Sequence, residues 1–176
     1  VKYTVTRNDG SVAAENIAET SFAESVPEPD ELTSYSYSVV ATNAGLSSSA
    51  ATSNSLSLGS IKVPYTNTFD TAEDMAGFTI IDANKDGKTW SYYTQQKKAM
   101  CSYSNVGNVD DWLITPPVKL LAGKIYTLSF TSSCSYVNYP ERLEVKMGKA
   151  ATADAMTEQI LPATLLTINT PVPFSK

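Results

Sequence analysis

The feature of this sequence that most constrains its fold is a two-residue alternation of apolar and polar side chains. Residues 35–41 read Tyr-Ser-Tyr-Ser-Val-Val-Ala, which puts both tyrosines, one valine and the alanine on one face and the serines on the other. This is the pattern of a half-buried strand. The alternation recurs at residues 3–6, 78–81, 126–130 and 143–147, with Asn, Asp, Gly and Pro turn signals between the segments. Many short strands of this kind predict an all-β antiparallel sandwich or jelly roll.

One segment departs from the alternation. Residues 150–160 are rich in Ala and contain Met and Glu, and Thr152 stands where an N-cap would be. We predict a short helix there.

Composition and charge exclude several classes of function. Of the 176 residues, 42% are hydrophobic and 18% charged, which is enough apolar material for a core. The net charge is -5 and the only basic doublet is Lys97-Lys98, so we expect no nucleic-acid partner, which would need clustered cations. The absence of histidine removes Ser-His-Asp and Cys-His nucleophiles and His-ligated zinc. No stretch approaches the roughly 18 apolar residues of a membrane span, and no signal-peptide pattern opens the chain, so we expect a soluble piece without membrane insertion.

A change of composition divides the chain. Residues 46–60 are small and polar and read as an edge strand that runs into a linker. We place the boundary near Ser60, which predicts two domains, residues 1–60 and 61–176.

The first domain contains four strand and turn blocks, in this order: Tyr3-Thr-Val-Thr-Arg-Asn-Asp-Gly10, Thr20-Ser-Phe22, Tyr35-Ser-Tyr-Ser-Val-Val-Ala41 and Ser53-Asn54. It resembles the second half of a fibronectin type III domain. The resemblance implies a spacer role and makes Tyr35 a tyrosine-corner residue, whose hydroxyl closes a strand connection. The first two strands of such a sandwich are absent before Val1. We therefore expect the inner face of the sheet to be exposed unless a longer parent chain or a neighbour covers it.

The second domain carries the most specific blocks: Pro64-Tyr65, Phe69-Asp70, Gly77-Phe78, Asp82-Ala-Asn84-Lys-Asp86-Gly87 before Trp90, Asp111-Trp-Leu-Ile-Thr-Pro-Pro117 and Glu141-Arg-Leu-Glu-Val-Lys-Met147. From about residue 61 to 167 it resembles the cleaved-adhesin domain, a jelly-roll module of gingipain hemagglutinin regions and of other secreted bacterial proteins. The strands that should finish the jelly roll are missing after this point. The resemblance implies a secreted or cell-surface setting, calcium binding, and a host protein or glycan as the ligand. In that setting we expect Cys101 and Cys134, which could otherwise be two buried thiols, to form a disulfide.

The residues themselves point to a cation site. Asp82, Asn84 and Asp86 alternate over a short turn closed by Gly87, and such oxygen clusters suit calcium. An EF-hand is excluded, because its twelfth loop position would need Glu and is Tyr93 here. The alternative is an Asx-rich turn whose side chains bond only their own backbone.

Three further acids are candidates for this site. Glu141 falls on the apolar face of its strand, where a buried carboxylate needs a partner such as calcium. A Lys partner, or fraying of the strand end into solvent, would serve as well. Asp70 and Asp111 are the other two candidates.

No pair of acidic residues indicates a glycosidase active site. A glycosidase needs two carboxyl groups about 5 to 9.5 Å apart across the substrate. Glu141 and Glu144 are three residues apart on one strand and point to opposite faces. We therefore expect a non-catalytic protein.

The aromatic side chains have two interpretations. Trp90, Trp112 and Phe130 fall in strand patterns and read as core. The tyrosines near turns either stack on ligands or cap the sandwich ends, and these are Tyr92, Tyr93, Tyr136 and Tyr139.

Three functions fit these observations. The first is an adhesin-type binding module of a larger secreted protein, in contact with its neighbouring domains and with a host protein or glycan. The second is a carbohydrate-binding module of a glycan-degrading enzyme, and the third is a structural spacer. Because jelly rolls host many functions, the fold alone does not choose between them.

Overall fold

The computed structural model describes residues 1–176 and is all-β, as the alternation predicts. Strands hold 43% of the residues and short 3₁₀ turns 4%. No helix in the structure is long and apolar enough to cross a membrane. The chain divides into two compact units, Val1–Lys62 (the first unit) and Val63–Lys176 (the second unit). This division falls two residues after the Ser60 boundary expected from composition.

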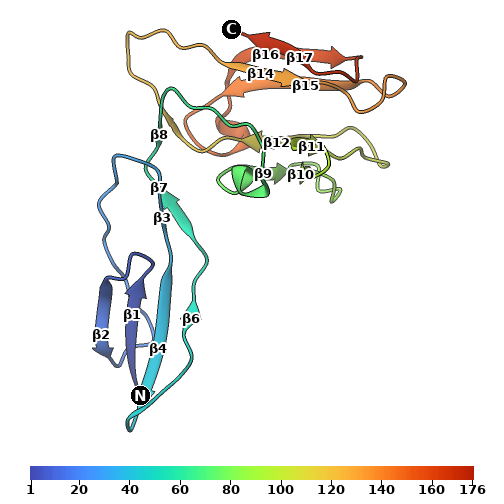
Figure 1. Ribbon diagram of the computed structural model, residues 1–176. Helices are drawn as coiled ribbons and strands as arrows, with labels where there is room; N and C mark the ends of the chain where they lie inside the picture. The colour runs from blue at the N-terminus through green and yellow to red at the C-terminus, as the bar shows by residue number, and fades with distance from the viewer. The chain divides into compact units, whose positions relative to one another are not determined.

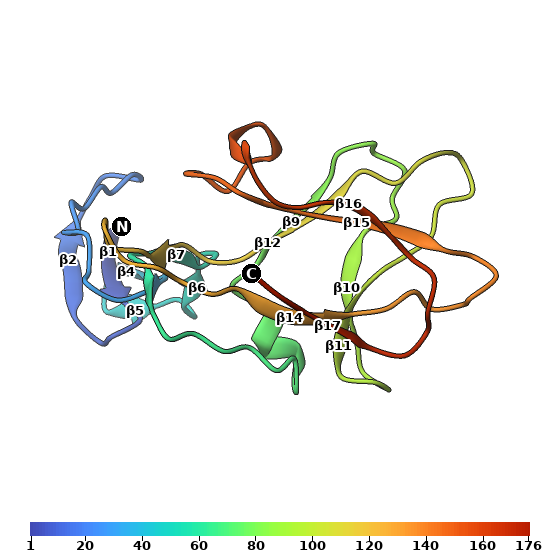
Figure 2. The same cartoon turned by 90° about the horizontal axis from the view of Figure 1, so that it is seen from above.

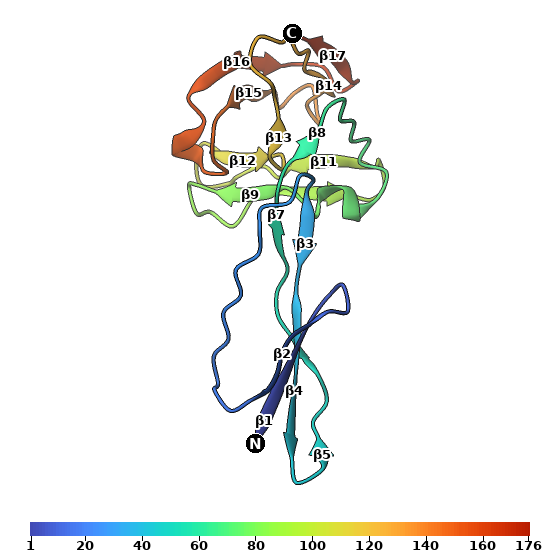
Figure 3. The ribbon, with the colours of Figure 1, turned by 90° about the vertical axis from the view of Figure 1, so that its left-hand side faces the viewer.

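The strands of the first unit are β1 (Lys2–Arg7), β2 (Val12–Ile17), β3 (Thr33–Tyr35), β4 (Tyr37–Asn43), β5 (Leu46–Ser47), β6 (Ala51–Thr52), β7 (Leu56–Leu58) and β8 (Ile61–Lys62). The main sheet has the order β2-β1-β4-β5, with β6 also paired to β4 (Figure 1). β3 pairs separately with β7 (Figure 3).

The alternation sets the register of the central pair. β1 and β4 are antiparallel, with Tyr3 opposite Ala41 and Val5 opposite Val39. Opposed residues share a face, so the apolar residues of both strands gather on one side. Val5 is 4% exposed and is the buried centre of the first unit.

The apolar face of this sheet is only partly covered. We expected it to be open to water, but the segment after β2 folds over it, with the Phe22 ring 6.4 Å from the Tyr37 ring. A hollow of about 970 Å³ remains, lined by the apolar face, by Phe22 and by Leu56 and Leu58 of β7.

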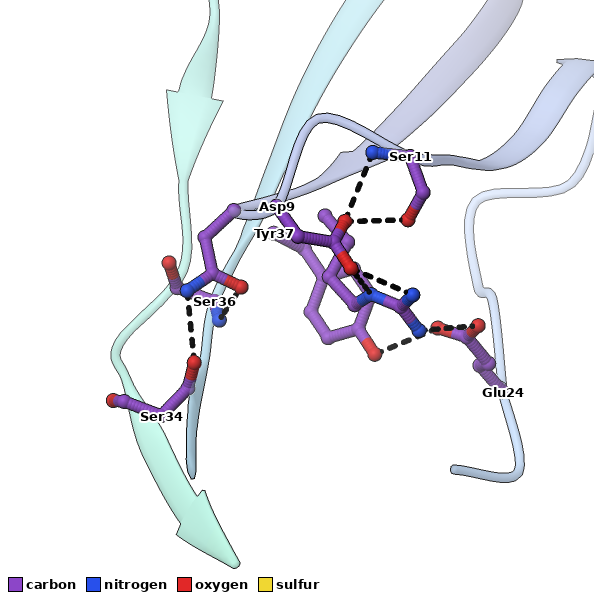
Figure 4. A network of polar contacts seen from close by, with 8 residues as sticks. Asp9, Ser11, Glu24, Ser34, Ser36 and Tyr37 are labelled. Atoms are coloured by element: carbon purple, nitrogen blue, oxygen red, sulfur yellow. Dashed lines mark hydrogen bonds and ion pairs between the residues drawn. The ribbon is translucent and has the colours of Figure 1, made fainter. Parts of the chain in front are cut away.

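Residues 35–41 form two strands where one was expected, because the chain changes partner at Ser36. The Ser36 carbonyl accepts a 2.9 Å bond from the Asn8 main chain, and the Ser36 N–H donates to Asn8 Oδ1 at 3.3 Å. The first bond extends the β1–β4 register by one residue, whereas the second turns the Ser36 N–H to a side chain in place of a main-chain partner. Figure 4 shows Ser36 in this network. The hydroxyl bond expected of Tyr35 is made by Tyr37, which donates to Glu24 Oε2 at 2.7 Å.

An ionic network fixes the β1–β2 turn and the covering segment. The Arg7 guanidinium pairs with Asp9 at 2.8 Å and with Glu24 at 3.2 Å. Asp9 also accepts bonds from the main chain and hydroxyl of Ser11 at 2.9 and 2.6 Å. Arg7 and Ser11 together hold the pKa of Asp9 well below its usual range. The network joins three segments of the first unit (Figure 4).

The strands of the second unit are β9 (Thr79–Asp82), β10 (Trp90–Tyr93), β11 (Lys98–Cys101), β12 (Asp111–Ile114), β13 (Val118–Lys119), β14 (Ser129–Ser132), β15 (Glu141–Met147), β16 (Glu158–Leu166) and β17 (Val172–Ser175). The 3₁₀ turns are η1 (Ala72–Met75) and η2 (Ala153–Ala155). The antiparallel pairs are β9–β12, β10–β11, β14–β17 and β15–β16.

These pairs form two layers, as in a β-sandwich. The pairs β14–β17 and β15–β16 lie in one layer and β9–β12 and β10–β11 in the other (Figures 1 and 3). The buried apolar side chains of the unit are Met75, Ile114, Pro116 and Cys134. Most other apolar side chains are half-buried, so the interior is thin.

The helix predicted for residues 150–160 is wrong. Only η2 is helical, Thr152 makes no side-chain cap, and β16 begins at Glu158. β16 pairs with β15 along its length, with Val145 opposite Leu161. This pairing buries apolar area that an isolated helix of this length would leave in water, and the strand therefore replaces the helix.

The strand expected at residues 126–130 starts later, at Ser129. Tyr126 instead accepts a 2.8 Å bond on its hydroxyl from the Leu121 N–H. This bond ties Tyr126 into the preceding loop.

Candidate functional site

The candidate site lies at the end of the second unit where four short strands begin or finish. β9 ends at Asp82 opposite Asp111, the first residue of β12. β10 begins at Trp90 opposite Cys101, the last residue of β11. The Trp90 indole donates a 3.0 Å bond to the Asp111 carbonyl oxygen, which ties the two pairs together. The connections after β9 and β11 therefore leave the sheet at the same end, on the right of Figure 2.

The first connection is wound around its own polar side chains. Asp82 accepts bonds from the N–H groups of Asp86 at 3.2 Å and Gly87 at 2.9 Å. Asn84 accepts from the Asp86 N–H at 3.4 Å and donates to the Asp86 carboxylate at 3.2 Å. Positive φ angles at Lys85 (+58°) and Gly87 (+76°) turn the chain back. The structure thus brings Asp82, Asn84 and Asp86 together, in the bonding pattern of an Asx-rich turn.

Asp111 is a half-buried carboxylate that the fold leaves incompletely paired. Its Oδ1 is buried without a hydrogen-bond partner, and its Oδ2 accepts only a 3.7 Å contact from the Cys101 thiol. Burial raises the pKa of Asp111, and the charges of Asp82 and Asp86 raise it further. The Thr89 hydroxyl, itself buried and without a bond of good geometry, opposes this rise.

The pKa of the Cys101 thiol is raised by burial and by nearby acidic side chains. Burial raises the pKa of Cys101 to about 12, with added contributions from Asp111, Glu141 and Asp86. Four acidic side chains, Asp82 among them, therefore act on the small volume around Asp111 and Cys101.

The prediction that Glu141 faces the interior is wrong. Glu141 is exposed and is the first residue of β15, opposite Leu166. It follows an exposed turn with nothing packed over it, so solvent satisfies its charge, as expected for a strand end. Its position leaves it close enough to affect Cys101.

The donor set matches a hard cation in chemistry and charge but not in spacing. Carboxylate and amide oxygens are the ligands that calcium prefers, and Asp111 Oδ1 is a buried oxygen without a partner. No three His, Cys, Asp or Glu side chains stand at ligating spacing around one point. A bound cation would therefore require side-chain rotation and would draw on carbonyl and amide oxygens as well.

Asp70 does not belong to this cluster in the structure. It lies beside the β10–β11 turn, accepting a 2.6 Å bond from Thr68 and pairing at 3.5 Å with Lys97. The Thr68 bond and the Lys97 charge lower the pKa of Asp70. Local partners therefore account for its charge.

The expected disulfide is absent, because both cysteines are free thiols. Cys134 is 2% exposed and its N–H donates a 3.0 Å bond to the Ile168 carbonyl oxygen. Cys101 points its thiol toward Asp111 and the Ser102 carbonyl oxygen. Each thiol therefore has its own surroundings in the second unit.

The tryptophans and Phe130 are part of the fold, as their strand patterns indicate. All three are half-buried. The Trp112 indole donates a 3.0 Å bond to Asp110, and the Phe130 ring lies 4.8 Å from that of Phe174.

The turn tyrosines separate into two groups. Tyr92 and Tyr93 are half-buried, and the Tyr92 hydroxyl donates to the Asp70 carbonyl oxygen at 2.8 Å. Tyr136 and Tyr139 are 69% and 72% exposed. The fold therefore uses Tyr92 and Tyr93, whereas it leaves Tyr136 and Tyr139 in solvent.

Tyr103 is a surface residue that sequence reasoning missed. It is 71% exposed in the connection between β11 and β12, which also contains Val106, 80% exposed. The available signal was an aromatic residue in a Ser-, Asn- and Gly-rich connection, where packing rarely needs one. Asn84 donates a 2.9 Å bond to the Asn108 carbonyl oxygen, so this connection is tied to the acidic turn.

Comparisons with protein-family models, with curated proteins and with solved structures found no match to this chain. Its function is therefore argued from the site itself.

Proposed function

We propose that this chain is a non-catalytic binding module of a larger secreted or cell-surface protein. The ligand, a host protein or a glycan, binds at the end of the second unit described above. The observation that carries the proposal is the exposure of three tyrosines there, Tyr103, Tyr136 and Tyr139, at 69 to 72%. Large aromatic side chains left in water at one end of a sandwich favour an interaction surface.

The position of these tyrosines supports a shared surface. Tyr103 lies in the connection that Asn84 ties to the acidic turn. Tyr136 and Tyr139 lie just before Glu141, whose charge acts on Cys101 at the same end. Figure 2 shows the connections before β12 and before β15 on the same side of the second unit.

The finer architecture is part of the proposal. The first unit would be a partial fibronectin type III-like spacer and the second a cleaved-adhesin-type jelly roll, each supported by its sequence blocks and by the all-β fold. A calcium ion held by Asp82, Asn84, Asp86 and Asp111 would be structural. Its charge would offset the repulsion among these acids and rigidify the connections that carry the binding surface.

A binding panel tests the proposal. The whole chain is applied to immobilised extracellular-matrix proteins and to a glycan array. We expect saturable binding to at least one member and its loss in the triple variant Tyr103→Ala, Tyr136→Ala, Tyr139→Ala. The control removes three exposed apolar side chains elsewhere, Leu46, Leu121 and Ile125, which are 58 to 98% exposed, and should bind as the wild type does. Absence of binding to both panels would contradict the proposal and favour the structural spacer.

A further inference from the structure

The turn between Cys134 and β15 holds two aromatic rings on one side of the backbone. Tyr136 and Tyr139 form an isolated antiparallel bridge, and the Tyr139 N–H donates a 3.0 Å bond to the Tyr136 carbonyl oxygen. Directly opposed residues of an antiparallel bridge point to the same face, with Cβ atoms about 4.5–5.5 Å apart. Val137 and Asn138 form the tip. The two phenol rings therefore leave the turn side by side.

The turn is anchored at both ends. Before it, Cys134 is 2% exposed and bonded to the Ile168 carbonyl oxygen at 3.0 Å. After it, β15 begins at Glu141, paired with Leu166 of β16. A ligand that binds the two rings would meet a backbone that is already ordered, which lowers the entropy cost of binding.

The fold itself makes no use of these rings. The structure gives neither hydroxyl a hydrogen bond, and the rings are 69% and 72% exposed. The tyrosines that serve the fold are half-buried, and several also have a bonded hydroxyl. Tyr37, Tyr92 and Tyr126 are half-buried and each has a bonded hydroxyl. Capping of the sandwich end therefore does not explain Tyr136 and Tyr139.

The chemistry of this turn fits a saccharide better than a protein. A stable protein interface buries about 800 Å² on each partner, more than a two-residue turn presents. An aromatic face carries negative charge density and attracts the C–H groups of a sugar ring, while the phenol hydroxyls and the Asn138 amide can bond sugar hydroxyls. The charged residues that follow, Glu141 and Arg142, have opposite signs, which favours a neutral sugar over a charged one.

We propose that Tyr136 and Tyr139 form an aromatic platform that binds neutral glycans by stacking. This inference rests on the proposed binding function and specifies its ligand class and contact residues.

The test measures binding of neutral gluco-, manno- and galacto-oligosaccharides to the whole chain by isothermal titration calorimetry. We expect binding of at least one of them, weakened up to about tenfold by Tyr136→Ala or Tyr139→Ala, as expected for the loss of one aromatic stacking contact. The double variant Tyr136→Phe, Tyr139→Phe keeps the rings and should stay within about threefold of the wild type. Ile125→Ala, which removes an exposed apolar side chain from the connection between β13 and β14, should leave glycan affinity unchanged.

The outcomes separate this inference from the proposed function. Binding of matrix proteins without any glycan would overturn the inference and leave the binding function standing. Glycan binding that survives both alanine variants would overturn the platform alone. Binding of neither class would overturn both proposals. Near-ultraviolet circular dichroism of each variant checks that the second unit stays folded.

Discussion

Replacing Asp111 by Asn should have opposite effects with and without calcium. Without a cation, Asp111 is a charged group with one buried, unpaired oxygen beside Asp82 and Asp86. The amide keeps the shape and removes the charge, so Asp111→Asn should be more stable than the wild type in EDTA. With calcium, the carboxylate would be a ligand, and the variant should lose the stabilisation that the ion gives.

The expected shift in Tm follows from the length of the second unit. Relief of a poorly satisfied buried group is worth about 1 kcal/mol, and a native-state ligand at 100 times its Kd adds about 2.7 kcal/mol. The unit spans Val63–Lys176, or 114 residues (176 − 62). At about 2.1 cal/mol/K of unfolding entropy per residue, 1 kcal/mol shifts Tm by roughly 4 °C. We expect the variant to melt roughly 4 °C above the wild type in EDTA, and calcium to raise the wild type by roughly 11 °C.

Tryptophan fluorescence isolates the relevant transition, because both tryptophans, Trp90 and Trp112, lie in the second unit. Melts are run in EDTA, in calcium and in magnesium at equal ionic strength. Asp154→Asn, the same charge change at an exposed residue of η2, should keep the calcium effect. The reasoning is refuted if calcium leaves wild-type melting unchanged, or if Asp111→Asn retains the full shift.

Three further predictions concern pH, thiol reactivity and the backbone. The pKa of Asp111 is higher in the folded than in the unfolded chain. Its contribution to stability is therefore fully present below the ordinary pKa of 3.8 and is lost as the pH rises through the folded-state pKa. The advantage of Asp111→Asn in EDTA should therefore grow with pH over that range in urea titrations, and a pH-independent difference would contradict this. Cys101, with a pKa of about 12 against 9.0 for a free thiol, should react with iodoacetamide on the order of 1,000-fold more slowly in the native chain than in urea. Mass spectrometry of the alkylated chain checks this. If iodoacetamide adds to neither cysteine in urea without reductant, the two cysteines form a disulfide. Gly59→Ala should cost the first unit about 1–3 kcal/mol, since φ is +85° and a Cβ would overlap main-chain carbonyls. Gly10→Ala, with a similar φ of +87° but open space, should cost less in the same urea denaturation followed by circular dichroism.

Alternation predicted the strands well where both partners carried it. The apolar faces of residues 3–6 and 35–41 meet at Val5 and Val39, as their two-residue period requires. The break at Ser36 was not predictable, because it depends on Asn8, which is 28 residues away in the chain. Local periodicity contains no information about such a partner.

The failures in the second unit have the same origin. Residues 150–160 have helical composition, but pairing of Val145 with Leu161 decides their conformation. The two-residue alternation places Glu141 on the same face as Leu143 and Val145. Because it is the first residue of β15, it is nevertheless exposed to solvent.

The acidic turn was the most predictable part of the site. Asp82, Asn84 and Asp86 are close in sequence and meet through local bonds. That Asp111 shares their field follows from its pairing with Asp82 in another strand. The exposed pair Tyr136 and Tyr139 was visible as turn aromatics, but their exposure needed the fold.

The thin interior of the two units has a consequence for the heat capacity of unfolding. The accessible surface is 12528 Å², whereas two compact units of these lengths would expose about 10,000 Å². Less apolar surface is therefore newly hydrated on unfolding, and the heat-capacity increment should fall below the usual range of about 12–15 cal/mol/K per residue. The stability curve of this chain should accordingly be flat, with stability that changes little on cooling from room temperature toward freezing.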